Sequence, residues 1–315
     1  MRVRVALSAI LFLVALGSHA PNRITPAPPP PAVSFVTFER VEDVRGLSGR
    51  LRLDGAWSLT SNDPRFGGLS ALHVEGGQVT AFSDSGWLIR FPLSGKAATV
   101  RAQISLAPGM GASADSKADR DVEAMAVLGP LAWVMLERRN LAIRYRRDTW
   151  QRDSYAEPKA MKDWRANNGG EAMLRLPDGR FLVFSEGKGG ISDVLMFIGD
   201  PAAPGTRAVK MRYHPPEGYG ITDAALTGDG RMLLLNRQAN IFKGGFVAKV
   251  VEAPIPETRA GGLIQGTEIA DLGWPLADNM EALSVTREGG RDILWMASDN
   301  NYNSIQRTLL LRFIL

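Results

Sequence analysis

Acidic or hydroxyl side chains recur about every fifty residues in this sequence, a spacing within the range of structural repeats. Each stands directly before an alanine, and the set is Ser70, Glu123, Glu171, Asp223 and Glu281. Carboxyl groups that converge repel one another unless a positive charge neutralises them. A hard divalent cation with oxygen ligands does so, and calcium tolerates irregular geometry. We therefore predict a divalent metal site, with calcium as the candidate ion and Glu123, Glu171, Asp223 and Glu281 as ligands.

Pairing with arginine is the alternative use of these acids. A second set of acids closes the strand that follows each start: Asp84, Glu137, Glu186 and Asp299. Arg138, Arg237 and Arg307 stand at or after such closing positions, where they could bind the acids directly. Arg237 replaces the closing acid in the fourth repeat and also offers a cation to an anionic substrate. The residues alone leave both arrangements open.

Other polar side chains are candidates for catalysis or substrate binding. His214 lies in Tyr213-His-Pro-Pro, on a predicted loop, whereas His73 falls within a predicted strand and is expected to be structural. The run from Asp299 to Asn303 is dense in amide groups, which suit a sugar or a phosphate but suit turns equally well. The chain has no cysteine, which excludes disulfides, thiolate metal sites and cysteine nucleophiles. A Gly-x-Ser-x-Gly elbow and a phosphate-binding Gly-rich loop ending in Lys are also missing.

Short strands and tight turns must position these residues. Each repeat continues from its polar start through a strand, a turn and a second strand such as Phe181–Phe184. Gly-rich turns, among them Gly76-Gly77 and Gly289-Gly290, predict hairpins. Repeats of this size made of short strands indicate a β-propeller. We predict an all-β fold of six blades, the sixth built from Phe35–Ser61 with strands near the C-terminus, so that N- and C-terminal strands close the ring.

Composition allows a large core and argues against a nucleic-acid partner. Of the 315 residues 45% are hydrophobic, and 37 Lys and Arg face 33 Asp and Glu. This small excess is spread along the chain, whereas nucleic-acid binding needs a concentrated basic face.

The N-terminus carries a targeting pattern. Arg2 and Arg4 precede an apolar run and then small residues, which predicts a secretory signal over 1–20. A short uncleaved anchor is the alternative, because Pro21 would obstruct cleavage after Ala20. A Pro-rich linker (21–33) and the propeller domain (34–315) follow, and no later stretch is apolar for long enough to cross a membrane. A periplasmic or secreted protein is expected.

An ordered series of short motifs gives the chain a family resemblance. The series is Phe66-Gly-Gly-Leu-Ser-Ala-Leu, Phe82-Ser-Asp-Ser-Gly, Asp121-Val-Glu-Ala-Met, Asn168-Gly-Gly-Glu-Ala-Met and Ser298-Asp-Asn-Asn…Gln306-Arg-Thr-Leu-Leu-Leu-Arg-Phe. From about Val33 to Leu315 it resembles the bacterial phytase-like propeller family, described as having esterase-like activity of phytase. The resemblance implies an exported β-propeller that hydrolyses phosphoesters or carboxylic esters. By analogy with metal-dependent propeller hydrolases it also implies Glu123, Glu171 and Glu281 as ligands.

Two classes of function follow from these observations. The first is a metal-assisted esterase or phosphoesterase of a small molecule, acting at the central channel, with a lactonase-type hydrolase as a variant. Its expected catalytic residues are Glu171, Arg237 and His214, and its expected substrate-binding residues are Asn300, Asn301, Arg307 and Asp84. The second is a non-catalytic propeller that presents its loops to a polysaccharide, a peptide or an envelope partner. The sequence leaves the substrate and the oligomeric state open.

Overall fold

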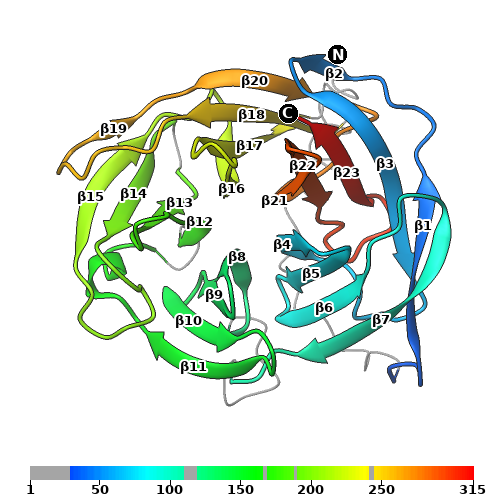
Figure 1. The fold of residues 1–315 in the computed structure, drawn as a ribbon, viewed down its shortest axis with the longest axis horizontal. Coiled ribbons are helices and arrows are strands. Elements are labelled where there is room, and N and C mark those ends of the chain that lie inside the picture. Colours follow the sequence, from blue (N-terminus) through cyan, green and yellow to red (C-terminus); the bar gives the residue numbers. More distant parts are fainter. Residues whose placement is uncertain (1–28, 110–118, 166–168, 188–189, 241–244) are drawn as a thin grey trace, which may run out of the picture. The chain divides into compact units, whose positions relative to one another are not determined.

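Runs of alternating apolar and polar residues form β-strands over most of this chain, and glycines between the runs form the turns. The computed structural model describes residues 29–109, 119–165, 169–187, 190–240 and 245–315. The predicted signal (1–20) and nearly all of the predicted linker (21–33) lie outside these residues. Pro31–Leu315 forms one unit in which antiparallel strands surround a common axis (Figure 1). The all-β propeller architecture is thereby confirmed.

Four sets of strands follow one another along the chain as blades. Blade 1 contains β4 (Leu69–Glu75), β5 (Gln78–Ser83), β6 (Trp87–Pro92) and β7 (Ala98–Leu106). Blade 2 contains β8 (Val122–Leu128), β9 (Leu131–Leu136), β10 (Leu141–Arg146) and β11 (Gln151–Ala156). Blade 3 contains β12 (Gly170–Arg175), β13 (Phe181–Ser185), β14 (Ser192–Phe197), β15 (Ala208–Tyr213) and, parallel to β15, β19 (Leu263–Ile264). Blade 4 contains β16 (Gly220–Leu226), β17 (Met232–Asn240), β18 (Gly245–Ala253), β20 (Thr267–Leu272) and β2 (Leu47–Gly49).

Blade 5 combines strands from both ends of the chain. It contains β21 (Met280–Glu288), β22 (Arg291–Ser298), β23 (Thr308–Ile314) and β3 (Arg52–Ser61), with β3 antiparallel to β23. β1 (Ser34–Arg40) pairs with both β3 and β7 and so continues this sheet into blade 1. A short 3₁₀ helix, η2 (Lys159–Met161), lies between blades 2 and 3 in sequence.

Five blades, rather than the expected six, surround the axis in the described part of the chain. The innermost strands follow one another around the ring in the order β4, β8, β12, β16 and β21, and β21 lies beside β4 (Figure 1). The segment expected as a sixth blade, Phe35–Ser61, instead supplies the outer strand β3 to blade 5 and the bridging strand β1. It contributes no inner strand. The estimate of six failed because this segment was counted toward a separate blade, whereas its strands β1, β2 and β3 join sheets of the five other blades.

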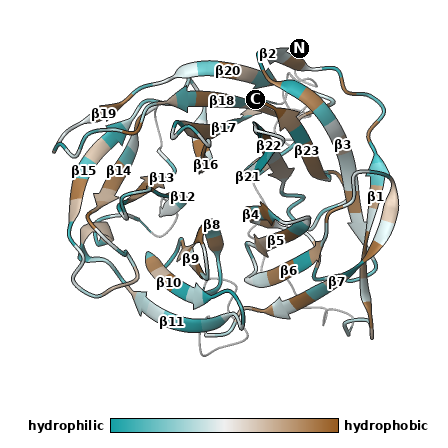
Figure 2. Ribbon diagram, viewed as in Figure 1, coloured by the Kyte–Doolittle hydropathy of each residue, from teal (hydrophilic) through white to brown (hydrophobic). Residues whose placement is uncertain are grey.

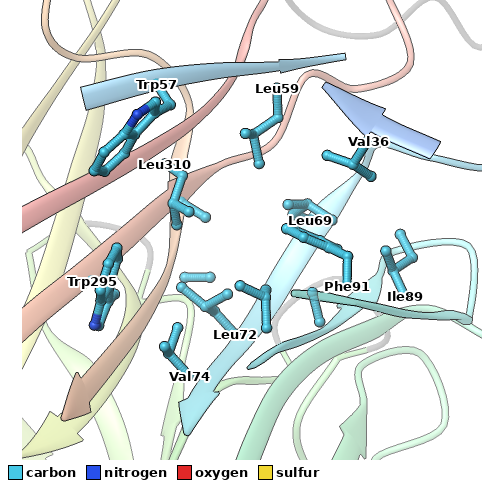
Figure 3. Close-up of a cluster of buried hydrophobic side chains, with 14 of the residues drawn as sticks. Val36, Trp57, Leu59, Leu69, Leu72, Val74, Ile89, Phe91, Trp295 and Leu310 are labelled. Atoms are coloured by element: carbon cyan, nitrogen blue, oxygen red, sulfur yellow. The ribbon is translucent and has the colours of Figure 1, made fainter. Parts of the chain in front are cut away.

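Apolar side chains between adjacent blades hold the ring together. Hydrophilic and hydrophobic bands alternate along strands such as β3 and β7, as expected for strands with one covered face (Figure 2). Where blades 5 and 1 meet, Trp57 and Trp295 stack with ring centroids 6.5 Å apart. Leu310, Leu69 and Phe91 belong to the same buried cluster (Figure 3). The described residues include no helix long and apolar enough to cross a membrane.

Candidate active site at the acidic mouth

A bulge at the start of every inner strand sets the position of the candidate site. The pairing register of each inner strand shifts after its first residues, so that one residue has no partner on the neighbouring strand. Bulges turn a side chain away from its regular direction and are common beside active sites. The residues left out of register are Ser70, Glu123, Glu171, Thr222 and Glu281. We call the end of the axis where they lie the acidic mouth.

Thr222, and not Asp223, takes the equivalent position in blade 4. Asp223 pairs in register with Leu235 and is buried. One of its carboxylate oxygens accepts the backbone N–H of Ala224 (2.7 Å) and the other accepts that of Leu283 on β21 (2.6 Å). Burial raises the pKa of Asp223, and the two backbone donors oppose that rise. The structure therefore places this predicted metal ligand as a link between blades 4 and 5, because the bulge moves the blade 4 alignment by one residue.

Three carboxyl groups gather around blade 2. Asp121 directly precedes β8, Glu123 is the bulged residue of β8, and Glu137 directly follows β9. One oxygen from each lies within 4.8 Å of the others. Glu171 of blade 3 donates a hydrogen bond from its carboxyl group to Glu137, which also accepts the backbone N–H of Gly169. A Cβ at Gly169 would collide with Glu137, so glycine is required for this approach.

Burial and mutual repulsion raise the pKa values of three acids at the mouth. Burial, followed by repulsion from Glu171 and Asp121, raises the pKa of Glu123 well above its usual value. Burial and repulsion from Glu137 and Glu186 do the same for Glu171. Burial and the charge of Asp121 raise the pKa of Glu137 to about 7. Bringing these groups together therefore costs free energy that a bound cation would offset.

Arg237 provides the positive side of the mouth. Its guanidinium donates to Glu281 and Asn279 and lies 5.5 Å from the centre of the Phe246 ring. Burial lowers the pKa of this guanidinium, while the charges of Glu171 and other nearby acids raise it. Glu281, a predicted metal ligand, is thus engaged by an arginine.

The predicted arginine–carboxylate network forms in part. Arg138 donates to Asp121 at 2.8 Å, and Arg237 pairs with Glu281. Arg307 instead pairs with Asp278 at 3.1 Å, in the loop that leads into β21. Cations and acids therefore alternate around blades 4 and 5, whereas carboxyl groups crowd together at blades 2 and 3.

A cavity of about 650 Å³ opens beside this crowded group, between blades 3 and 4. Its wall includes all three predicted catalytic residues, Glu171, Arg237 and His214. Phe246 and Tyr219 give it an apolar side. This volume is within the usual range for small-molecule sites. The cavity therefore offers room for a substrate between a carboxyl-rich wall and a guanidinium.

The predicted substrate-binding residues lie apart from this cavity, mostly around blades 5 and 1. The Asn300 side chain accepts the backbone N–H of Gly68 (3.0 Å), and Asn301 donates to Gln306 (2.8 Å). Buried Asp84 accepts the Ser85 hydroxyl. Arg307 lies over Trp274 as well as binding Asp278. The Asn301 amide thus serves a local turn, whereas the Asn300 amide links the loop after β22 to the segment before β4.

Asp121 is the member of this carboxyl group that is not among the ligands predicted from the sequence. Its spacing could have indicated it, because Asp121 stands two residues before Glu123, the bulged residue at the start of β8, and so lies at the same end of the strand.

The chain is similar to several solved structures and matches one family model. The chain is similar to the crystal structure of Myxococcus xanthus glutaminyl cyclase, with 13% identity and a TM-score of 0.48, over 85% of this chain and 99% of that one. It is also similar to an α-L-arabinanase of Cellvibrio cellulosa, with 13% identity and a TM-score of 0.42, over 75% and 88% of the two chains. A search of curated proteins gives no match. The model of the phytase-like family, described as "esterase-like activity of phytase", matches residues 64–302, and the chain therefore belongs to this family.

Proposed function

We propose that this protein hydrolyses ester or phosphoester bonds of a small molecule at the acidic mouth, with the help of a divalent cation. The observation that carries the proposal is the group formed by Asp121, Glu123 and Glu137, whose oxygens lie within 4.8 Å of one another. A cavity of about 650 Å³ with Glu171 in its wall adjoins this group. Membership of a family described by esterase-like activity supports ester hydrolysis.

The residues present suit a hard cation. All the donors in the group are carboxylate oxygens, which calcium and magnesium prefer, and Gly169 leaves the space that Glu137 needs. Asp121, Glu123 and Glu137 would hold the ion, and Glu171 could join them. When bound, such an ion supplies Lewis acidity toward an ester oxygen and lowers the pKa of a coordinated water. Calcium remains the candidate.

The chain's own residues would divide the remaining work. Glu171 would take a proton from the attacking water, since it lines the cavity and since burial raises its pKa, which makes its carboxylate a stronger base than that of a free glutamate. Arg237 would hold an anionic oxygen of the substrate. His214, an exposed residue in the wall of the same cavity, would return a proton to the leaving oxygen.

Metal analysis with a substrate panel tests the proposal. The purified protein should bind calcium or another divalent ion, and its melting temperature should rise with the ion and fall with a chelator. Activity on nitrophenyl esters, nitrophenyl phosphate and a lactone should follow the metal content. Glu123→Gln and Glu137→Gln should abolish most of the metal-induced shift. Glu217→Gln, which alters an exposed acid of the same cavity, should not.

A binding propeller without catalysis is the second candidate. The ion pairs Arg138–Asp121 and Arg237–Glu281 favour it, because they neutralise two acids without a metal. It predicts no metal-induced shift and no turnover on any member of the panel. The lactone separates a lactonase-type hydrolase from an enzyme of open-chain esters.

Export is part of the proposal, together with division of the chain into signal (1–20), linker (21–33) and propeller (34–315). The basic start and apolar run that follows support it. Mass spectrometry of the protein from its native cells should find an N-terminus near residues 17–22. An intact Met1 on a soluble protein would contradict cleavage.

A further inference from the structure

A second cavity, of about 450 Å³, lies away from the acidic mouth where blade 1 meets the turn between β10 and β11 of blade 2. Three arginines line it, Arg90, Arg101 and Arg147, together with the donor side chains of Gln78, Thr80 and Gln103. One carboxylate, Asp148, also lines it, and it pairs with Arg146 at 3.2 Å. We call this cavity the arginine cleft.

Strand register explains why these side chains converge. Thr80 on β5, Arg90 on β6 and Gln103 on β7 are direct cross-strand neighbours, so they share one face of blade 1. Arg101 stands two residues before Gln103 and therefore lies on that face as well. The opposite face carries Ile89 and other buried core residues. Blade 1 thus turns a polar outer half toward blade 2.

Blade 2 packs against only part of this face. Phe82 of β5 contacts Trp150 with ring centroids 5.6 Å apart. Near Thr80 and Arg90, Trp150 and Arg147 instead form one wall of the cleft. This part of the face is therefore a donor-lined recess and not a packed interface.

The arginines of the cleft are short of negative partners. Arg90 donates to the neutral amide of Gln103 at 2.6 Å. The exposed side chain of Arg101 makes no hydrogen bond or ion pair with any residue in the described part of the chain. Arg147 is bound by Glu75 and by the Gly129 carbonyl, which fixes its guanidinium in the wall. Such planar donors match the oxygens of a phosphate group.

We infer that the arginine cleft binds a phosphate-bearing small molecule through Arg90 and Arg101, with Arg147 as a fixed part of its wall. Its volume lies within the usual range for small-molecule sites.

Calorimetric titration with pyrophosphate, at low ionic strength and with a chelator present, tests this inference. The full chain should bind pyrophosphate at one saturable site. Arg101→Gln and Arg90→Gln should each weaken binding about tenfold, since each removes a charged hydrogen-bond donor. The matched control is Arg212→Gln, which changes an exposed arginine on β15 of blade 3 and should bind as the wild type does.

Three results would overturn the inference that the arginine cleft binds a phosphate-bearing molecule. The first is no saturable binding of pyrophosphate by the wild type. The second is an Arg101→Gln variant that binds as the wild type does, or an Arg212→Gln variant weakened equally. The third is citrate binding as tightly as pyrophosphate, which would show a general affinity for polyanions. Arg101 is exposed on an outer strand, so its substitution leaves the fold intact, and circular dichroism of the variant checks this.

Discussion

The charged forms of the carboxyl groups at the acidic mouth repel one another unless a proton or a cation neutralises them. Glu123, Glu137 and Glu171 all have raised pKa values, because burial and neighbouring acids disfavour their charged forms. A raised pKa in the folded state means that the folded protein takes up protons more readily than the unfolded chain. This preference makes stability depend on pH in a direction that can be tested.

Metal-free protein should lose stability as the pH rises from about 4.5 to about 7. Below the pKa of an unfolded glutamate both states are protonated, and the folded state carries no penalty. Above the folded pKa of Glu137, which is about 7, the full penalty is present. Melting temperatures in chelator, measured from pH 5 to pH 8, should fall in the wild type.

Glu137→Gln should flatten part of that fall, since the amide does not ionise. The expected gain in unfolding free energy at pH 8 is on the order of 2 kcal/mol. A wild type whose stability is constant or rising over this range would show that the three acids are neutralised internally.

Asp223 should behave as a structural acid. Its two oxygens accept backbone N–H groups from Ala224 and Leu283, and an asparagine in its place would turn an N–H₂ group toward one of those donors. Asp223→Asn should lower the unfolding free energy by about 1–3 kcal/mol. Its metal-induced rise in melting temperature should stay as large as in the wild type. Loss of the metal response without loss of stability would return Asp223 to the ligand set.

At the scale of strands, local sequence patterns predicted the hairpins well, whereas the assignment of strands distant in sequence to one blade was predicted less well. Inner strands and their hairpins followed from alternating residues and from glycine turns such as Gly76-Gly77, both at positive φ. Those signals are local, because a tight turn dictates which strand comes next to which. β3 pairs with β23, from the other end of the chain, and no local pattern shows that both strands belong to the blade that begins with β21. The blade count therefore came out one too high.

The candidate active site also combines residues that local sequence patterns predicted with residues that they did not. Glu123 and Glu171 were identified because a polar residue before alanine recurs in each repeat, and both do occupy bulges. Asp223 was assigned in place of Thr222, since a bulge adds a residue that sequence spacing does not reveal. Asp121 is recognised as a candidate ligand only in the folded structure, where it lies beside Glu123 and Glu137.

Gly55 on β3 should be intolerant of any side chain. A Cβ there would collide with the indole of Trp57, which is buried and stacked on Trp295. Gly55→Ala should therefore cost about 1–3 kcal/mol of unfolding free energy. Gly95→Ala is the matched control, because open space surrounds that position, and a change of at most about 0.5 kcal/mol is expected. Denaturant unfolding measures both, and equal effects would refute the packing argument.

At the scale of the whole propeller, two groups of charged side chains of opposite sign divide the chemistry. The acidic mouth offers carboxylates for a cation, and the arginine cleft offers guanidinium groups for an anion. They draw on different parts of the fold: the bulged starts of inner strands form the first, and the outer strands of blade 1 form the second. The acidic mouth and the arginine cleft keep their geometry only while the blades of the ring remain packed together.

Closure of the ring of blades should depend on β23. Its buried residues Leu309, Leu310, Leu311 and Phe313 pack between β22 and β3, which lose their common neighbour if the strand is removed. Burial of each side chain contributes about 2 kcal/mol. Together they approach the total stability of a typical domain, about 5–15 kcal/mol. A chain ending at Arg307 should therefore show no cooperative thermal transition by circular dichroism. A chain beginning at Pro29 keeps every described strand and should melt as the full chain does. Cooperative melting of the chain that ends at Arg307 would mean that blades 1–4 hold together without closure of the ring.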